Sequence, residues 1–147
     1  MTLEQEVIHW KNMVKLYKFD HLTGLKQRHD FEVETMHKMQ HQHFYLVMVD
    51  VVGLHRINRK KGFSAGDDLI KQVAHDLQSV SGIWETYRIG GDEFVALFFD
   101  EPDFFGIDNA TCAYVDSREF EYLSDMLKSV DELVTKKKEK LNRRRED

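Results

Sequence analysis

The sequence has few of the residues that mark secreted, membrane-spanning or low-complexity proteins. Its 147 residues include one proline and one cysteine, Cys112. A single thiol cannot form a disulfide framework, and we assign it no chemistry. The longest apolar run, Phe44 to Val49, is too short to cross a bilayer, and the chain is charged from Glu4, without the apolar core of a signal peptide. We therefore expect a cytoplasmic protein without a membrane span.

The chain also lacks an excess of positive charge. Its 21 Lys and Arg against 26 Asp and Glu give −5, which disfavours nucleic acid as a partner. The segment from Lys136 to Arg145 holds seven basic residues and one acid, or +6, so the rest of the chain carries −5 − 6 = −11. Such a run could contact triphosphate or anionic lipid, but it is typical of a solvated helix end, where positive charge suits the dipole.

Apolar spacing predicts a single α+β domain. Helices are expected at 28–40, at 54–61, from about 65 and from 123, and strands at 44–50, 84–89, 94–99 and 111–115. This order predicts an antiparallel or mixed sheet with helices mainly on one face. In the hairpin between the second and third strands, Gly90 and Gly91 are expected to supply positive φ angles.

The N-terminal 19 residues form a segment of their own. Its apolar residues recur at spacings of four and three, as on the seam of a coiled coil. They are Leu3, Val7, Trp10, Val14 and Tyr17. The same pattern fits a helix packed on its own domain, and the sequence does not choose between the two. We expect three parts: this helix (1–19), a domain (20–135) and a basic helix end or tail (136–147).

Three carboxylates are predicted to meet at one edge of the sheet. Asp50 ends the first strand, and Asp92 and Glu93 lie at the tip of the hairpin. Oxygen ligands on rigid elements bind Mg²⁺ or Mn²⁺, and such ions bridge nucleotide phosphates. Spacing alone also fits an ordinary solvated hairpin.

Three blocks in the same order resemble the GGDEF family of diguanylate cyclases. Asp20 to Arg28 matches the opening D-x-L-T-G-L-x-N-R except at Gln27, and Arg88 to Phe94 reads R-I-G-G-D-E-F. The central block matches the family at Asp50, Asn58, Gly62, Gly66 and Asp67. Three ordered blocks are far more specific than the five-letter signature alone.

The resemblance implies a palm-like domain that condenses two GTP molecules into cyclic di-GMP, releasing pyrophosphate. It implies a homodimer with one GTP in each half and Mg²⁺ or Mn²⁺ as cofactor. Carried over residue by residue, the metal-binding groups are Asp50, the carbonyl of Val51, Asp92 and Glu93, and Glu93 lies beside the attacking hydroxyl. The guanine readers are Asn58 and Asp67, the phosphate-binding backbone is Gly53, Leu54 and His55, and Lys138 is the triphosphate-binding lysine.

The chain departs from the family pattern around these positions. Val52, Leu54, His55 and Arg59 replace an acid, a phenylalanine, a lysine and an acid, and Phe63 replaces a histidine. A short loop, 100–110, stands where the family has a full helix, which shortens the C-terminal half. Two alternatives therefore stay open: a related cyclase with another cyclic di- or oligonucleotide product, and a degenerate module that binds GTP or a partner protein without turnover.

A histidine cluster is the remaining candidate site. His37, His41 and His43 have spacings that could hold a metal. They have no cysteine partner and lie among glutamines, so we interpret them as solvated histidines.

Overall fold

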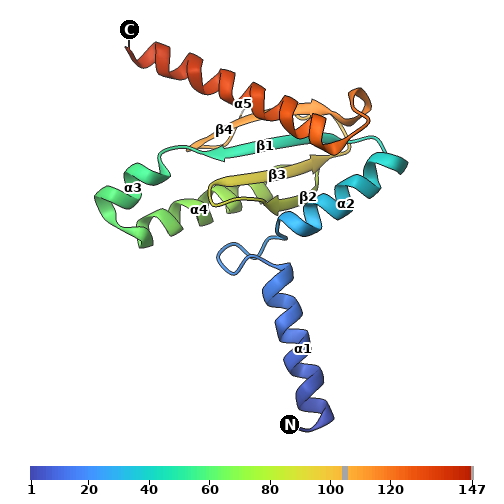
Figure 1. Ribbon diagram of the computed structural model, residues 1–147. Coiled ribbons are helices and arrows are strands. Elements are labelled where there is room, and N and C mark those ends of the chain that lie inside the picture. The colour runs from blue at the N-terminus through green and yellow to red at the C-terminus, as the bar shows by residue number, and fades with distance from the viewer. Residues whose placement is uncertain (104–105, 147) are drawn as a thin grey trace.

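The computed structural model describes residues 1–103 and 106–146, with side chains through 142 (Figure 1). The side chains of 143–146 and all of Asp147, which belong to the predicted basic tail, lie outside what the structure describes. The helices are α1 (Leu3–Lys18), α2 (Arg28–His41), α3 (Leu54–Lys61), α4 (Phe63–Gln78), the 3₁₀ turn η1 (Ser117–Glu119) and α5 (Leu123–Glu146). The strands are β1 (Tyr45–Val51), β2 (Ile83–Arg88), β3 (Glu93–Phe98) and β4 (Ala110–Asp116). Among the described residues, no helix is long and apolar enough to cross a membrane.

The four strands form one antiparallel sheet in the order β2-β3-β1-β4. The sequence predicted an antiparallel or a mixed sheet, and in the structure every strand pair is antiparallel. The described residues between β3 and β4 hold no helix, so the predicted α+β fold with a shortened C-terminal half is confirmed.

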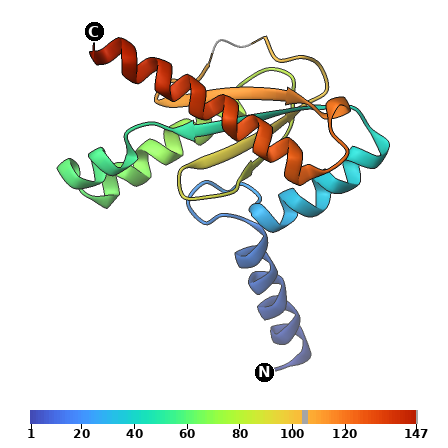
Figure 2. The same ribbon diagram turned by 45° about the horizontal axis from the view of Figure 1, so that its top comes forward.

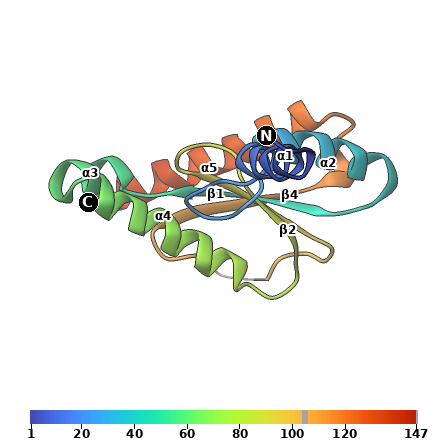
Figure 3. The same cartoon turned by 90° about the horizontal axis from the view of Figure 1, so that it is seen from below.

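The prediction that helices lie mainly on one face is wrong. Phe31 of α2 and Met126 and Val130 of α5 pack on one face of the sheet, and Ile70 and Val73 of α4 pack on the other. Figures 2 and 3 show α5 and α4 on opposite sides. The reason is the continuous apolar run of β1, since successive side chains of a strand point to opposite faces and both sets are apolar here.

Helix α1 projects away from the domain (Figure 1). It begins with a capping box between Thr2 and Gln5 and has no buried residue. The five predicted seam residues are between 44% and 78% exposed. The structure thus rules against a helix packed on its own domain, and the seam stays free for another chain.

Candidate functional site

Strand pairing places two of the three predicted acids opposite each other. Asp50 of β1 pairs in register with Glu93 of β3 on one side and with Thr111 of β4 on the other. Directly opposite residues of antiparallel strands project to the same face of the sheet. Asp92 lies directly before Glu93, at the tip of the hairpin. Its carbonyl accepts a hydrogen bond from the backbone N–H of Val51 at 2.8 Å. The predicted meeting of the three acids at one sheet edge is therefore present.

The hairpin tip differs from the expected turn. Neither Gly90 nor Gly91 has a positive φ, so that prediction is wrong. The N–H of Ile89 donates to the carbonyl of Glu93 at 3.0 Å, which leaves three residues in the loop. Two-residue type I′ and II′ turns require positive φ angles, because the turn must match the strand twist. This longer turn closes without them.

The acids crowd one another. Burial raises the pKa of Glu93, and the nearby carboxylates of Asp50 and Asp92 raise it further. Asp131 of α5, which is not one of the predicted site residues, adds to the same effect. Lys138 lies further along α5, and its ammonium group contacts the carboxylate of Asp50. No group of three His, Cys, Asp or Glu within the described residues forms a ready-made metal cage.

A hollow of about 620 Å³ opens beside these acids. Its walls come from the end of β1, the start of α3, the hairpin tip, β4 and α5. Expected residues in the wall are Val51, Gly53, Leu54, His55, Asp92 and Lys138, and residues that sequence reasoning missed are Arg56, Asn109 and Thr111. Thr111 is buried and its hydroxyl oxygen has no hydrogen-bond partner. Strand register identifies it, because Thr111 pairs directly with Asp50.

The first turn of helix α3 lines this hollow. Gly53 precedes it with a φ of 80°, in the left-handed region that favours glycine. Its carbonyl accepts the first helical bond, from the N–H of Ile57 at 3.0 Å. The N–H groups of the following residues are left without helical partners, as at every helix start, and such groups can bind an anion.

The two predicted guanine readers lie at the corner between α3 and α4. Asn58 packs so closely on Gly66 that a Cβ at position 66 would lie 1.7 Å from its Oδ1 atom. That oxygen is buried and has no hydrogen-bond partner. A second hollow of about 550 Å³ is lined by His55, Asn58, Arg59 and Phe63. Asp67 follows Gly66 and is exposed, but it lines neither hollow.

The three histidines that we predicted to be solvated lie on α2 and just after its end. The rings of His37 and His41 lie 4.7 Å apart between centroids. His43 instead bonds through Nε2 to Oδ1 of Asp116 at 3.0 Å. The structure thus separates His43 from the other two by giving it a carboxylate partner.

The sequence matches the family described as "Diguanylate cyclase, GGDEF domain" over residues 17–104. Among curated proteins, it is 29% identical over 99 residues to an uncharacterised membrane protein of Staphylococcus aureus (strain USA300). That match covers 60% of this chain and 28% of the relative, so this chain spans under a third of the curated relatives it matches.

Solved structures share the fold. The coiled coil and GGDEF domain of DgcB from Caulobacter crescentus, crystallised with c-di-GMP, matches with a TM-score of 0.79 and 16% identity, over 93% of this chain and 88% of that one. Diguanylate cyclase SiaD from Pseudomonas aeruginosa, in complex with its activator SiaC, matches with a TM-score of 0.73 and 19% identity, over 93% and 65%. The family match over more than half of the sequence, the ordered motifs and this fold agree: the chain belongs to the GGDEF family.

Proposed function

We propose that this chain is a diguanylate cyclase, which condenses two GTP molecules into cyclic di-GMP and releases two pyrophosphates. The observation that carries the proposal is the register of Asp50 opposite Glu93, next to a hollow whose walls include Asp92, the start of α3 and Lys138. Each 3′-hydroxyl would attack the α-phosphorus of the other GTP, forming one P–O bond as the bond to pyrophosphate breaks. Membership of the GGDEF family supports this reaction class.

Asp50, Asp92, Glu93 and the carbonyl of Val51 would hold Mg²⁺ or Mn²⁺. They fit these ions because all are hard oxygen donors. The raised pKa of Glu93 reflects its burial first and then crowded negative charge, and a cation would neutralise that charge. When bound, the ion would supply Lewis-acid activation of the hydroxyl and stabilise the leaving pyrophosphate.

The remaining groups would bind and orient the nucleotide. The N–H groups of Gly53, Leu54 and His55 would hold phosphate oxygens, and Lys138 would move from Asp50 to balance the triphosphate charge. Asn58 and Asp67 would read guanine, because a carboxylate accepts from both N1–H and N2–H₂ while an amide both donates and accepts.

A homodimer completes the proposal. One site binds one GTP, so a product made from two needs two facing sites. The exposed seam of α1 is suited to join two copies, since an isolated helix of this length gains stability by burying its apolar face. The rate should then rise more steeply than linearly with protein concentration in the range where the dimer dissociates.

One observation favours a second candidate. Arg59 and Phe63 line the hollow that Asn58 reaches, and both differ from the family pattern. A changed wall beside the base readers could admit a different base, giving a related cyclase with another cyclic di- or oligonucleotide product.

The deciding experiment incubates the purified chain with GTP, with ATP and with both, in Mg²⁺ or Mn²⁺, and identifies products by mass. Cyclic di-GMP and pyrophosphate from GTP alone would support the proposal. A mixed or adenine-containing product would favour the second candidate. Saturable GTP binding without any product in either metal would contradict the enzyme and indicate a degenerate module.

A further inference from the structure

The sheet edge that carries the acids also carries Thr111. In the register of the sheet, Glu93 of β3 lies directly opposite Asp50 on one side, and Thr111 of β4 lies directly opposite it on the other. Opposite residues of antiparallel strands project to the same face, with Cβ atoms about 4.5–5.5 Å apart. Asp50 therefore has a carboxylate as one neighbour and a hydroxyl as the other.

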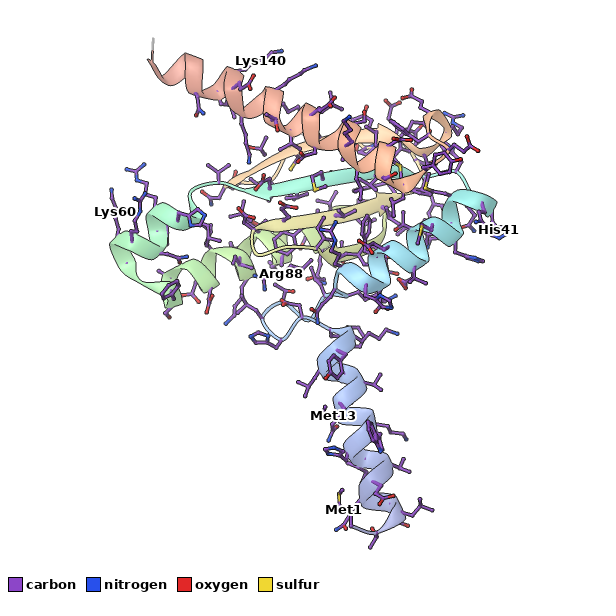
Figure 4. The ribbon with its side chains drawn as sticks, in the orientation of Figure 1. Met1, Met13, His41, Lys60, Arg88 and Lys140 are labelled. Carbon is purple, nitrogen blue, oxygen red and sulfur yellow. The ribbon has the colours of Figure 1, made fainter. Side chains whose placement is uncertain are left out.

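Helix α5 covers this row of side chains. Met48 of β1, two residues before Asp50, lies in the core cluster that includes Val130 of α5. Because alternate residues of a strand share a face, Asp50 and its neighbours in the row continue that face. Figure 4 shows α5, which carries the labelled Lys140, lying along β1 and β4. Thr111 is accordingly only 4% exposed, although it lines the hollow beside the acids.

The hydroxyl group of Thr111 is buried without a hydrogen bond. Its Oγ1 atom has no partner among the described residues. A buried hydroxyl that makes no hydrogen bond costs stability, so folded proteins pair almost all such groups. Valine would fill nearly the same space without this cost and is equally suited to a strand. A threonine at this position is therefore best explained by a hydrogen bond that forms only when the site is occupied.

The carboxylate of Asp50 is the acceptor that lies beside this hydroxyl. In the present structure its Oδ2 atom contacts the ammonium group of Lys138. In the proposed function Lys138 moves to the triphosphate, and the carboxylate of Asp50 then loses that donor. Its neighbours at the hairpin, Asp92 and Glu93, carry carboxylates that repel it when ionised. Thr111 is the neutral donor next to Asp50, and its hydroxyl is free to take over from Lys138.

We propose that Thr111 is a positioning residue, whose hydroxyl donates to the carboxylate of Asp50 and orients that carboxylate toward the cation. Groups that hold a metal-binding side chain in this way raise metal affinity by about 10–100-fold. Thr111 itself contacts neither the cation nor the nucleotide. The role rests on the metal site of the proposed function, but it does not depend on turnover.

Binding of Mn²⁺ to the full chain without nucleotide tests this role. Electron paramagnetic resonance of free Mn²⁺ measures the affinity. Thr111→Val removes the hydroxyl and should lower the affinity about tenfold, whereas Thr111→Ser keeps the hydroxyl and should stay within about twofold of the wild type. Unchanged affinity in Thr111→Val, or an equal loss in both variants, would overturn the role.

Thermal unfolding without metal gives a readout of the opposite sign. Thr111→Val removes an unpaired buried hydroxyl, so Tm should hold or rise by about 2 °C, whereas the loss of a hydrogen bond already present in the metal-free fold would lower it. A lower Tm would therefore overturn the proposal.

Thr35 offers a matched control for both measurements. It is fully buried on α2, and its hydroxyl also lacks a partner among the described residues, but it does not line the hollow beside the acids. Thr35→Val should show a similar change in Tm with unchanged Mn²⁺ affinity. An equal loss of Mn²⁺ affinity in Thr35→Val and Thr111→Val would overturn the specific role of Thr111.

The result can be separated from the test of the proposed function. Weaker Mn²⁺ binding by Thr111→Val, with no product from the wild type, would contradict the cyclase and leave the positioning role standing. Cyclic di-GMP from the wild type, with unchanged Mn²⁺ affinity in Thr111→Val, would do the reverse. A wild type that binds no Mn²⁺ would overturn the role of Thr111. So would a variant that loses only metal-free GTP binding, because Thr111 would then contact the nucleotide.

Discussion

The two sides of the site are built differently. Asp50 and Glu93 lie on β1 and β3, whose other residues are almost all buried between two layers of helices. The proposed base readers lie on the α3–α4 corner, and α3 has no buried residue. Three of the departures from the family pattern, His55, Arg59 and Phe63, lie on this second side, whereas Asp50, Asp92 and Glu93 all match the family. We therefore expect the two sides to control rate and base choice separately.

The largest expected effect is on the sheet side. Glu93→Gln keeps the shape of the side chain but removes a negative charge, so turnover should fall by about 10² or more. KM for GTP should change little, because the base and phosphate contacts remain. Steady-state kinetics with product detection measures both. Glu132→Gln, an exposed change of the same type on α5, is the matched control and should retain full activity. Wild-type turnover in Glu93→Gln would contradict the role of this acid.

The corner should instead change which base is accepted. Asp67→Ala leaves guanine N1–H and N2–H₂ without an acceptor, so use of GTP should weaken by roughly 1–3 kcal/mol and the preference over ATP should narrow. Competition between GTP and ATP measures this directly. The neighbouring exposed Asp68→Ala is the control. An unmutated protein that already prefers ATP would show that Asp67 does not select guanine.

A substitution at Gly66 tests the role of Asn58 in the α3–α4 corner. In Gly66→Ala the new Cβ would overlap Oδ1 of Asn58, at 1.7 Å, so the amide must move away from the base. Stability should change by less than about 1 kcal/mol, because alanine in a helix gains about as much as the displaced side chain costs. KM for GTP should rise several-fold while kcat holds. Asn58→Ala combined with Gly66→Ala should be no worse than Asn58→Ala alone. An additive double variant would mean that Gly66 acts through something other than Asn58.

Much of this structure could be predicted from local pattern. The helix at 54–61 has the predicted bounds, and each strand begins and ends within one residue of its prediction. Such elements can be predicted because apolar runs mark buried segments and glycines mark the turns between them. The three acids could be predicted to meet because a strand end and a hairpin tip are topologically constrained.

The contacts between distant segments could not be predicted in this way. Arg88 and Asp20 are 68 positions apart, and the pairing of Lys26 with β2 brings them together. The family motifs contain both residues, but no periodicity relates them. Asp131 and Thr111 near the acids likewise depend on the placement of α5 and on strand register. The prediction that helices lie mainly on one face failed for a simpler reason. Strand β1 is apolar on both faces, so helices must cover each face of the sheet.

The smallest expected effect returns to Glu93 and concerns stability. Burial and the carboxylates of Asp50 and Asp92 raise the pKa of Glu93 above its ordinary value of 4.5, so the folded state favours the protonated form. A raised acid pKa gives stability that is present below the ordinary pKa and is lost as pH rises through the folded value. At neutral pH the charged Glu93 therefore destabilises the fold. Glu93→Gln should raise Tm at pH 7 without metal by on the order of 1 °C, because Glu93 is only partly buried and solvent screens its charge. The gain should vanish below about pH 4, where Glu93 is protonated in both states. Glu132→Gln should show no such gain, and a fall in Tm for Glu93→Gln at pH 7 would mean that its carboxylate stabilises the sheet edge.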